Sequence, residues 1–175
     1  MRLLCEAPDR TKLRGWRDRA LLSVLASSGC RISEVITVTS TQIRSTAGSF
    51  FLEVVGKNRI THRVAPLSGE AFAAIESWLA RRPVQSEYVF TTLPGNRPTT
   101  RPLDRSSAWR LVQRYARAVG LIGVSPHSFR RFVGTELARK DIRQAQKALG
   151  HANIETTAKH YILDELEGGL TDGLY

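Results

Sequence analysis

The sequence predicts a mainly α-helical domain that carries one small antiparallel β-sheet, an α+β fold. Most of its 175 residues fall in segments where apolar side chains recur every three or four positions, as in amphipathic helices. One stretch departs from this pattern, because between residues 50 and 66 two β-rich segments flank a Gly-Lys-Asn-Arg turn. The length and the hydrophobic fraction of 42% suit one globular domain with a substantial core.

The N-terminal part is predicted to hold two consecutive helices. Residues 1–15 show no clear period, so we expect a loosely ordered lead-in there. A helix over residues 16–28 ends at Gly29, and a short helix over 30–36 is broken by the polar run TVTSTQ. The inward side is formed by Leu21, Val24, Leu25 and Ser28 in the first helix and by Ile32, Val35 and Ile36 in the second.

The middle of the chain is predicted to form the sheet. Residues 50–55 are apolar and rich in β-branched side chains, and residues 60–66 alternate loosely, so the pair is expected to form a hairpin. The intervening turn, GKNR, places Lys57 at the hairpin tip. Residues 88–90 are short, apolar and aromatic, which favours one more short strand.

Two further helices are predicted around a polar loop. The first covers residues 69–82, and the loop over 93–102 is rich in Pro, Gly and Arg. Asp104 or Ser106 then caps a helix that runs to about Val119. The inner faces are expected to carry Phe72, Ile75 and Leu79 in the first helix and Trp109, Val112 and Val119 in the second.

The last third is predicted to be helical throughout. Ser125 is a favourable N-cap and Pro126 suits the first helical position, which begins a helix that ends near Arg139. Asp141 caps the next helix and Gly150 ends it.

A third helix in this part is expected to carry Tyr161, with Asn153 as its cap. The acidic, Gly-rich tail over residues 164–175 is expected to leave the body of the domain. The chain is therefore divided into a lead-in, a domain over residues 16–163 and this tail.

The charge points to a polyanionic partner. The chain has 26 Lys and Arg residues against 16 Asp and Glu, a net charge of +10, which favours nucleic acid over a surface that is basic merely for solubility. Such charge implies no base specificity, because phosphate contacts position a protein without reading the sequence. The lack of a long apolar run, a signal peptide or a disulfide framework favours the cytoplasm and excludes a membrane partner.

Several polar residues have positions that suit chemistry on a phosphate. His127 and Arg130 lie three residues apart on one helical face, and Arg131 is also within reach of His127. Arg31 stands at a helix start, where the dipole disfavours a cation unless an anion or acid is near. Glu34, three residues later, can orient the Arg31 guanidinium from the same face.

Each candidate also has an ordinary structural interpretation. Lys57 fits a solvated turn, His151 fits a helix C-terminus where it complements the dipole, and Tyr161 fits a core aromatic. No zinc motif, nucleotide-binding glycine loop or serine-hydrolase elbow occurs. Metal chemistry is therefore not predicted for the four histidines, His62, His127, His151 and His160.

Together and in this order, the residues resemble the tyrosine recombinases, the phage-type integrase family. The matching motifs, which span Arg31 to Tyr161, are SGCRISE, GKNR with HRVAPL, SPHSFRR, and KALGH with TTAKHYI. The resemblance implies the integrase catalytic-domain fold and a site-specific recombinase that cleaves and rejoins DNA. The implied reaction passes through a 3′-phosphotyrosyl intermediate and uses no metal, cofactor or ATP.

The resemblance also implies a role for each matching residue. Tyr161 is the nucleophile, Lys57 protonates the leaving 5′-oxygen, and His151 donates a hydrogen bond to the phosphate. We take His127 as the candidate base, and Glu34 supports the first arginine. The implied catalytic set is Arg31, Lys57, His127, Arg130, His151 and Tyr161.

The family further implies double-stranded DNA as the partner, with a homotetramer on DNA and a monomer when the domain is isolated. Basic residues expected to contact DNA are Arg59, Arg131 and Lys159. This chain has His160 where the family usually has its tyrosine, with Tyr161 one residue later. The N-terminal DNA-clamping domain of most members is not expected within these 175 residues, and the cell would be bacterial or phage-infected.

Three alternatives remain open at this point. The same chemistry is used by a chromosome-dimer resolving recombinase and by a type IB topoisomerase. The third alternative is a non-catalytic DNA-binding module, which would use the positive charge without the catalytic residues. The sequence does not indicate the target site, the direction of recombination or any accessory protein.

Overall fold

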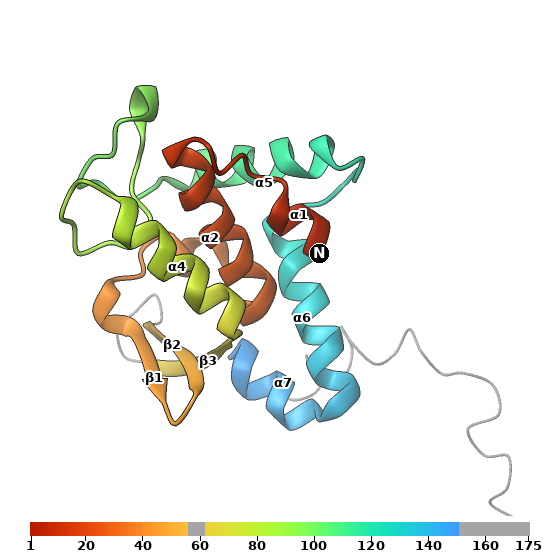
Figure 1. Cartoon of the computed structure of the whole chain (residues 1–175). Coiled ribbons are helices and arrows are strands. Elements are labelled where there is room, and N and C mark those ends of the chain that lie inside the picture. Colours follow the sequence, from red (N-terminus) through yellow and green to blue (C-terminus); the bar gives the residue numbers. More distant parts are fainter. Residues whose placement is uncertain (56–61, 151–175) are drawn as a thin grey trace, which may run out of the picture.

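A helical body and a three-stranded sheet make up the structure, a computed structural model that describes residues 1–55 and 62–150 (Figure 1). The predicted α+β class is confirmed. In chain order the elements are α1 Arg2–Glu6, α2 Leu13–Ser28, α3 Ile32–Val35, the 3₁₀ turn η1 Ser40–Gln42, β1 Ile43–Thr46, β2 Ser49–Val55, β3 His62–Leu67, α4 Gly69–Arg81, the 3₁₀ turn η2 Pro94–Asn96, α5 Arg105–Ala118, α6 Pro126–Lys140 and α7 Ile142–Leu149.

Helix α2 is the centre of the body. It packs against α4 on one side and α6 on another, and α1 lies against it as well (Figure 1). Contact on several sides explains why its buried residues are not confined to one stripe, since Leu21, Leu22 and Leu25 are all fully buried. The predicted helix over residues 16–28 is thus confirmed, and it begins slightly earlier, at Leu13.

Gly29 ends α2 as predicted and lets three elements meet. Its φ of 61° lies in the left-handed region, which glycine enters without steric cost. A Cβ on Gly29 would stand 2.9 Å from Cδ2 of Leu149 and 3.0 Å from Cγ1 of Val133, so α6 and α7 approach its backbone closely. The chain therefore turns directly from α2 into Cys30 and Arg31 beside the ends of two other helices.

The sheet is antiparallel with the order β1-β2-β3. Val55 pairs with His62, so β2 and β3 form the predicted hairpin arms, and the connection between them lies outside the described residues. Strand β1 was not predicted, because its sequence, IRST, is mainly polar. Its residues are mostly exposed in the structure, as is usual for an edge strand. The strand predicted over residues 88–90 is wrong, because only an isolated bridge from Tyr88 to Thr39 forms there.

The lead-in expected over residues 1–15 is not loosely ordered. It contains α1 and the start of α2, and Leu4 is fully buried against the core. A helix as short as α1 is stabilised mainly by this packing, which a search for helical periodicity cannot detect.

Several predicted inner faces need correction. In α4 the fully buried aromatic is Trp78, whose Nε1 donates to the Val89 carbonyl at 2.7 Å, whereas Phe72 and Leu79 are half-buried. In α5 the side chain of Trp109 remains 48% exposed, because Ala108, Leu111, Val112 and Ala116 form the buried face. Small alanines face the core in both helices, so the largest apolar residues are poor guides to the buried side.

The caps of the last helices agree with prediction. Asp104 accepts a hydrogen bond from the Ser107 backbone at 2.8 Å, and Asp141 accepts one from Arg143 at 2.8 Å. Pro126 occupies the first turn of α6, and Gly150 ends α7 in the left-handed conformation. Helix α7 packs on both α6 and β3, which places the C-terminus of α7 beside the sheet.

A buried carboxylate ties α2 to α5. Asp18 is fully buried and accepts hydrogen bonds from Arg17 and Arg114, each at 2.7 Å, and from the Tyr115 hydroxyl at 3.0 Å. Burial, together with the Asp18 charge, raises the pKa of Tyr115 to about 12. Tyr115 is therefore a structural hydroxyl that stays protonated at neutral pH.

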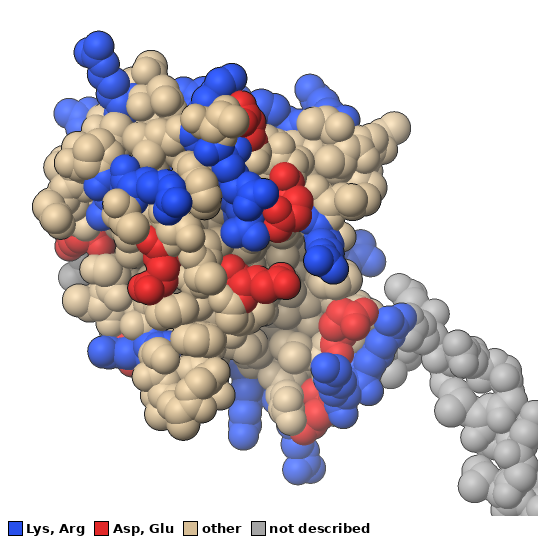
Figure 2. Space-filling model, in the orientation of Figure 1, with Lys and Arg blue, Asp and Glu red and all other residues tan. Residues whose placement is uncertain are grey.

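The positive charge is spread over several elements on the face seen in Figure 2. Figure 2 shows one face, on which Lys and Arg side chains occur over several elements with acidic side chains between them. This face therefore carries no single basic patch. No helix within residues 1–55 and 62–150 is long and apolar enough to cross a membrane.

Candidate active site

Arg31 is the N-cap residue of α3 and is held there by Glu34. The Glu34 carboxylate accepts the Arg31 backbone N–H at 2.6 Å through Oε2 and the Arg31 Nη1 at 3.1 Å through Oε1. The expected unfavourable position of a cation at a helix start is thus offset by an adjacent acid. The side chain of Arg31 is 54% exposed and that of Glu34 only 13%, so a fixed carboxylate orients an accessible guanidinium.

Arg130 on α6 is buried, whereas its neighbour Arg131 is exposed. The guanidinium of Arg130, with 3% of the residue exposed, donates from Nη1 to the Gly29 carbonyl at 2.9 Å and from Nη2 to the Leu149 carbonyl at 2.6 Å. Of the two arginines, Arg130 therefore lies against the core and Arg131 faces solvent.

Three of the six predicted catalytic residues line one cleft. Arg31, His127 and Arg130 contribute to a cleft of about 450 Å³ between the α3 start, α5 and the first turn of α6. His127 is exposed at this opening. The other lining residues are Ile32, Ser33, Arg105, Trp109, Ser125 and Pro126.

Sequence reasoning missed Arg105 and Trp109 in this cleft. They lie four residues apart on one face of α5, and such a face carrying an arginine and a half-exposed tryptophan is the signal that indicates them. Trp109 also lines a wider groove of about 1070 Å³ whose basic residues come from α2 and α5. These basic residues are Arg14, Arg17, Arg110, Arg114 and Arg117.

The remaining predicted residues lie outside the described part of the chain. Lys57 and Arg59 fall between Val55 and His62, and the others follow Gly150. Gly150 itself is next to Leu149, whose carbonyl contacts Arg130. The undescribed candidates after Gly150 are His151, Lys159 and Tyr161.

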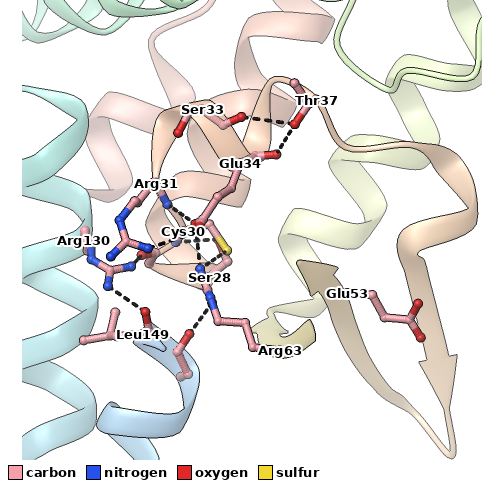
Figure 3. A network of polar contacts seen from close by, with 12 residues as sticks. Ser28, Cys30, Arg31, Ser33, Glu34, Thr37, Glu53, Arg63, Arg130 and Leu149 are labelled. Atoms are coloured by element: carbon pink, nitrogen blue, oxygen red, sulfur yellow. Dashed lines mark hydrogen bonds and ion pairs between the residues drawn. The ribbon is translucent and has the colours of Figure 1, made fainter. Parts of the chain in front are cut away.

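A third arginine, Arg63 of β3, completes the polar network beside Arg31 and Arg130 (Figure 3). Its Nη2 lies 2.6 Å from Oε2 of Glu34 and 3.5 Å from Sγ of Cys30, and its Nη1 donates to the Ala148 carbonyl. Arg130 and Arg63 therefore contact the last two carbonyls of α7, at Leu149 and Ala148. Within the described residues, no group of three or more His, Cys, Asp or Glu side chains is placed to hold a metal ion.

Burial lowers the acidity of both thiols. It raises the pKa of Cys30, against the opposing effect of the Arg63 guanidinium, and it raises the pKa of Cys5 to about 11. A raised pKa keeps each group in its thiol form at neutral pH.

We expect neither cysteine to react rapidly with a maleimide in the folded chain at about pH 8, because the thiolate is the reactive form. Labelling of Cys5 should accelerate as the pH approaches its pKa of about 11. Mass spectrometry of timed samples measures both rates, and the urea-unfolded chain, in which both thiols should react, is the control. Fast labelling of Cys30 in the folded chain would contradict its burial beside Arg63.

The comparison with known protein families identifies the chain. A model of the phage integrase family matches residues 1–166. The chain belongs to the phage integrase family. The resemblance seen in the sequence motifs is therefore confirmed.

The relatives are bacterial tyrosine recombinases. Tyrosine recombinase XerD of Xanthomonas campestris is 35% identical over 165 residues, which cover 88% of this chain and 50% of the relative. Tyrosine recombinase XerC of Chlamydia caviae is 32% identical over 163 residues, which cover 89% of this chain and 50% of the relative. The chain thus spans about half the length of the curated relatives it matches.

Solved structures of the family share the fold. The XerH site-specific recombinase bound to difH substrate has a TM-score of 0.78 at 22% identity, covering 94% of this chain and 49% of XerH. The XerA recombinase has a TM-score of 0.77 at 26% identity, and the match covers 93% of this chain and 57% of XerA. A λ integrase dimer bound to a COC′ core site gives 0.68 at 15% identity, covering 94% and 46%, so the predicted integrase catalytic-domain fold is confirmed.

Proposed function

We propose that this chain is the catalytic domain of a site-specific tyrosine recombinase that cleaves and rejoins duplex DNA. The observation that carries the proposal is that Arg31 and Arg130, each held by acceptors of its own, line one cleft with His127. Guanidinium groups bind phosphate oxygens through paired hydrogen bonds and keep their charge at every physiological pH. Membership of the phage integrase family supports assigning DNA strand cleavage to this cleft.

In the proposed reaction the two arginines bind the nonbridging oxygens of the scissile phosphate and stabilise the extra charge of the pentacoordinate transition state. The hydroxyl oxygen of Tyr161 attacks phosphorus, the bond to the 5′-oxygen breaks, and a 3′-phosphotyrosyl link forms. His127 accepts the phenol proton, because a tyrosine with an ordinary pKa near 10 needs a base at neutral pH.

The residues proposed to protonate the leaving group and to donate a hydrogen bond to the phosphate lie outside the described part of the chain. Lys57 gives a proton to the departing 5′-oxygen, and His151 donates a hydrogen bond to the phosphate. The covalent link conserves the phosphodiester energy, so attack by a 5′-hydroxyl reverses the reaction without ATP, metal or cofactor.

Double-stranded DNA is the proposed partner. The XerH and λ integrase structures that share this fold hold DNA sites, and the arginine-rich groove beside α5 offers further charge for a phosphate backbone. We assign backbone contacts to Arg59, Arg131 and Lys159. Further parts of the proposal are a catalytic body that includes α1 and all of α2 and runs to residue 163, a C-terminal segment exchanged between protomers, a tetramer on DNA and a cytoplasmic location in bacterial or phage-infected cells.

Formation of a covalent protein–DNA band tests the proposal. The 175-residue chain is incubated with nicked duplexes that carry a randomised arm, so that the short cleaved fragment diffuses away and the adduct is trapped. We expect a band that survives denaturation and disappears on proteolysis, and its DNA should share one sequence. Tight binding without an adduct would favour a non-catalytic module, and sequence-independent relaxation of supercoiled DNA would favour a type IB topoisomerase.

A further inference from the structure

Arg63 has no assigned part in the reaction, although it touches both halves of the site. We propose that Arg63 is a positioning residue, which directs Arg31 through Glu34 and fixes the end of α7 beside Arg130. The proposal rests on the proposed function. Its side chain, 15% exposed, comes from β3 and reaches across to the start of α3 and the end of α7 (Figure 3).

The first connection runs through the Glu34 carboxylate. Its Oε1 accepts from the Arg31 guanidinium, and its Oε2 accepts both the Arg31 backbone N–H and the Arg63 Nη2. Arg63 thus holds the carboxylate from β3, and Arg63 itself does not line the cleft. Without Arg63, Oε2 loses its charge-assisted hydrogen bond and keeps only the Arg31 backbone N–H, so the carboxylate is held less firmly about its last torsion. The half-exposed Arg31 guanidinium would then be oriented less firmly.

The second connection runs through the end of α7. The last carbonyls of a helix have no partner within the helix, and a cation near them is favourable. Arg63 contacts the Ala148 carbonyl and Arg130 the Leu149 carbonyl, so two guanidinium groups secure consecutive carbonyls. A Cβ on Gly150 would stand 2.6 Å from Cδ of Arg63, which shows how closely the side chain passes.

The shape of arginine explains why this residue suits the position. Arg63 uses its two terminal nitrogens on different acceptors, Nη2 on Glu34 and Nη1 on Ala148. A lysine offers a single ammonium group and cannot present a planar fork to two acceptors. Arg63→Lys should therefore keep the charge beside Glu34 and restore only part of the function that Arg63→Met loses.

The test compares two substrates at saturating protein under single-turnover conditions. One nicked duplex, carrying the site recovered from the covalent adduct, has the natural scissile phosphate. In the other a methylphosphonate replaces one charged nonbridging oxygen by a methyl group. We expect Arg63→Met to slow cleavage of the phosphate about 10–100-fold, the range found for partners that orient a site's charged groups. On the neutral methylphosphonate the loss should shrink to less than about 3-fold, because the charge that Arg31 balances is gone.

Arg44→Met is the matched control. Arg44 is also a strand arginine paired with a glutamate, at 3.0 Å from Glu53, but it is 57% exposed, and among the described residues its guanidinium bonds only to Glu53. We expect it to cleave both substrates at the unmodified rate. Thermal unfolding of every variant is followed by circular dichroism, and rates are compared at a temperature where all are folded.

A double variant provides the second criterion. If Arg63 acts through Arg31, then adding Arg63→Met to the Arg31→Ala variant should slow cleavage of the phosphate much less than Arg63→Met slows it in the unmodified chain. The reason is that the effects of residues acting as a unit are not additive. Equal loss on both substrates together with additive losses would overturn the inference and leave Arg63 a purely structural residue. Failure of the unmodified chain to cleave either substrate would instead overturn the proposed function, and the positioning role with it.

Discussion

We expect the Tyr161→Phe variant to bind duplex DNA as tightly as the unmodified chain and to form no covalent adduct. The change removes one oxygen, the atom proposed to attack phosphorus, and keeps the aromatic ring. Electrophoretic mobility shift measures binding, and a denaturing gel with the nicked duplex measures the adduct. The loss of adduct should be complete, because no other atom of phenylalanine can replace the hydroxyl.

The neighbouring residue provides the control for the unusual spacing. His160→Ala should reduce adduct formation far less than Tyr161→Phe, although His160 stands where the family usually has its tyrosine. Transfer of the adduct to Tyr115 in the Phe variant would contradict the assignment. The structure argues against such transfer, because the Tyr115 hydroxyl donates to buried Asp18 and its pKa is raised to about 12.

The helices that the sequence predicted best are those whose ends are marked locally. Gly29 ends α2, while Pro126 and Asp141 begin α6 and α7, and each acts on backbone groups within a few residues. Such signals do not depend on the rest of the fold. Buried faces were harder to predict, because α4 and α5 turn alanines inward and leave Trp109 half-exposed.

The residues of the candidate site also fall into those that local motifs predicted and one, Arg63, whose role depends on long-range contacts. The ordered motifs indicated Arg31, Glu34, His127 and Arg130, and the structure brings them together around one cleft. Arg63 lies within the motif HRVAPL, but its role could not be found by such reasoning, because its partners Glu34 and Ala148 lie 29 and 85 residues away in sequence. Contacts of that range depend on tertiary packing and not on a local pattern.

The second large effect is expected for Arg130→Met, which should reduce both stability and cleavage. The arginine is almost fully buried, and its loss removes hydrogen bonds to the Gly29 and Leu149 carbonyls. Each buried carbonyl left without its donor costs about 1–3 kcal/mol of unfolding free energy. A typical domain is stable by roughly 5–15 kcal/mol, so the variant should remain folded at low temperature.

The cleavage rate separates the two roles of Arg130. The rate is measured at a temperature where Arg130→Met is folded and at a protein concentration that saturates the DNA. We expect the single-turnover cleavage rate to fall about 10²–10³-fold, as when one donor to a developing charge is removed. Arg131→Met, at the next position of the same helix but exposed, is the matched control. As a proposed backbone contact, Arg131 should affect salt-dependent affinity and leave the saturated rate nearly unchanged. A normal saturated rate for folded Arg130→Met would show that Arg130 only ties α6 to α7 and that another cation binds the phosphate.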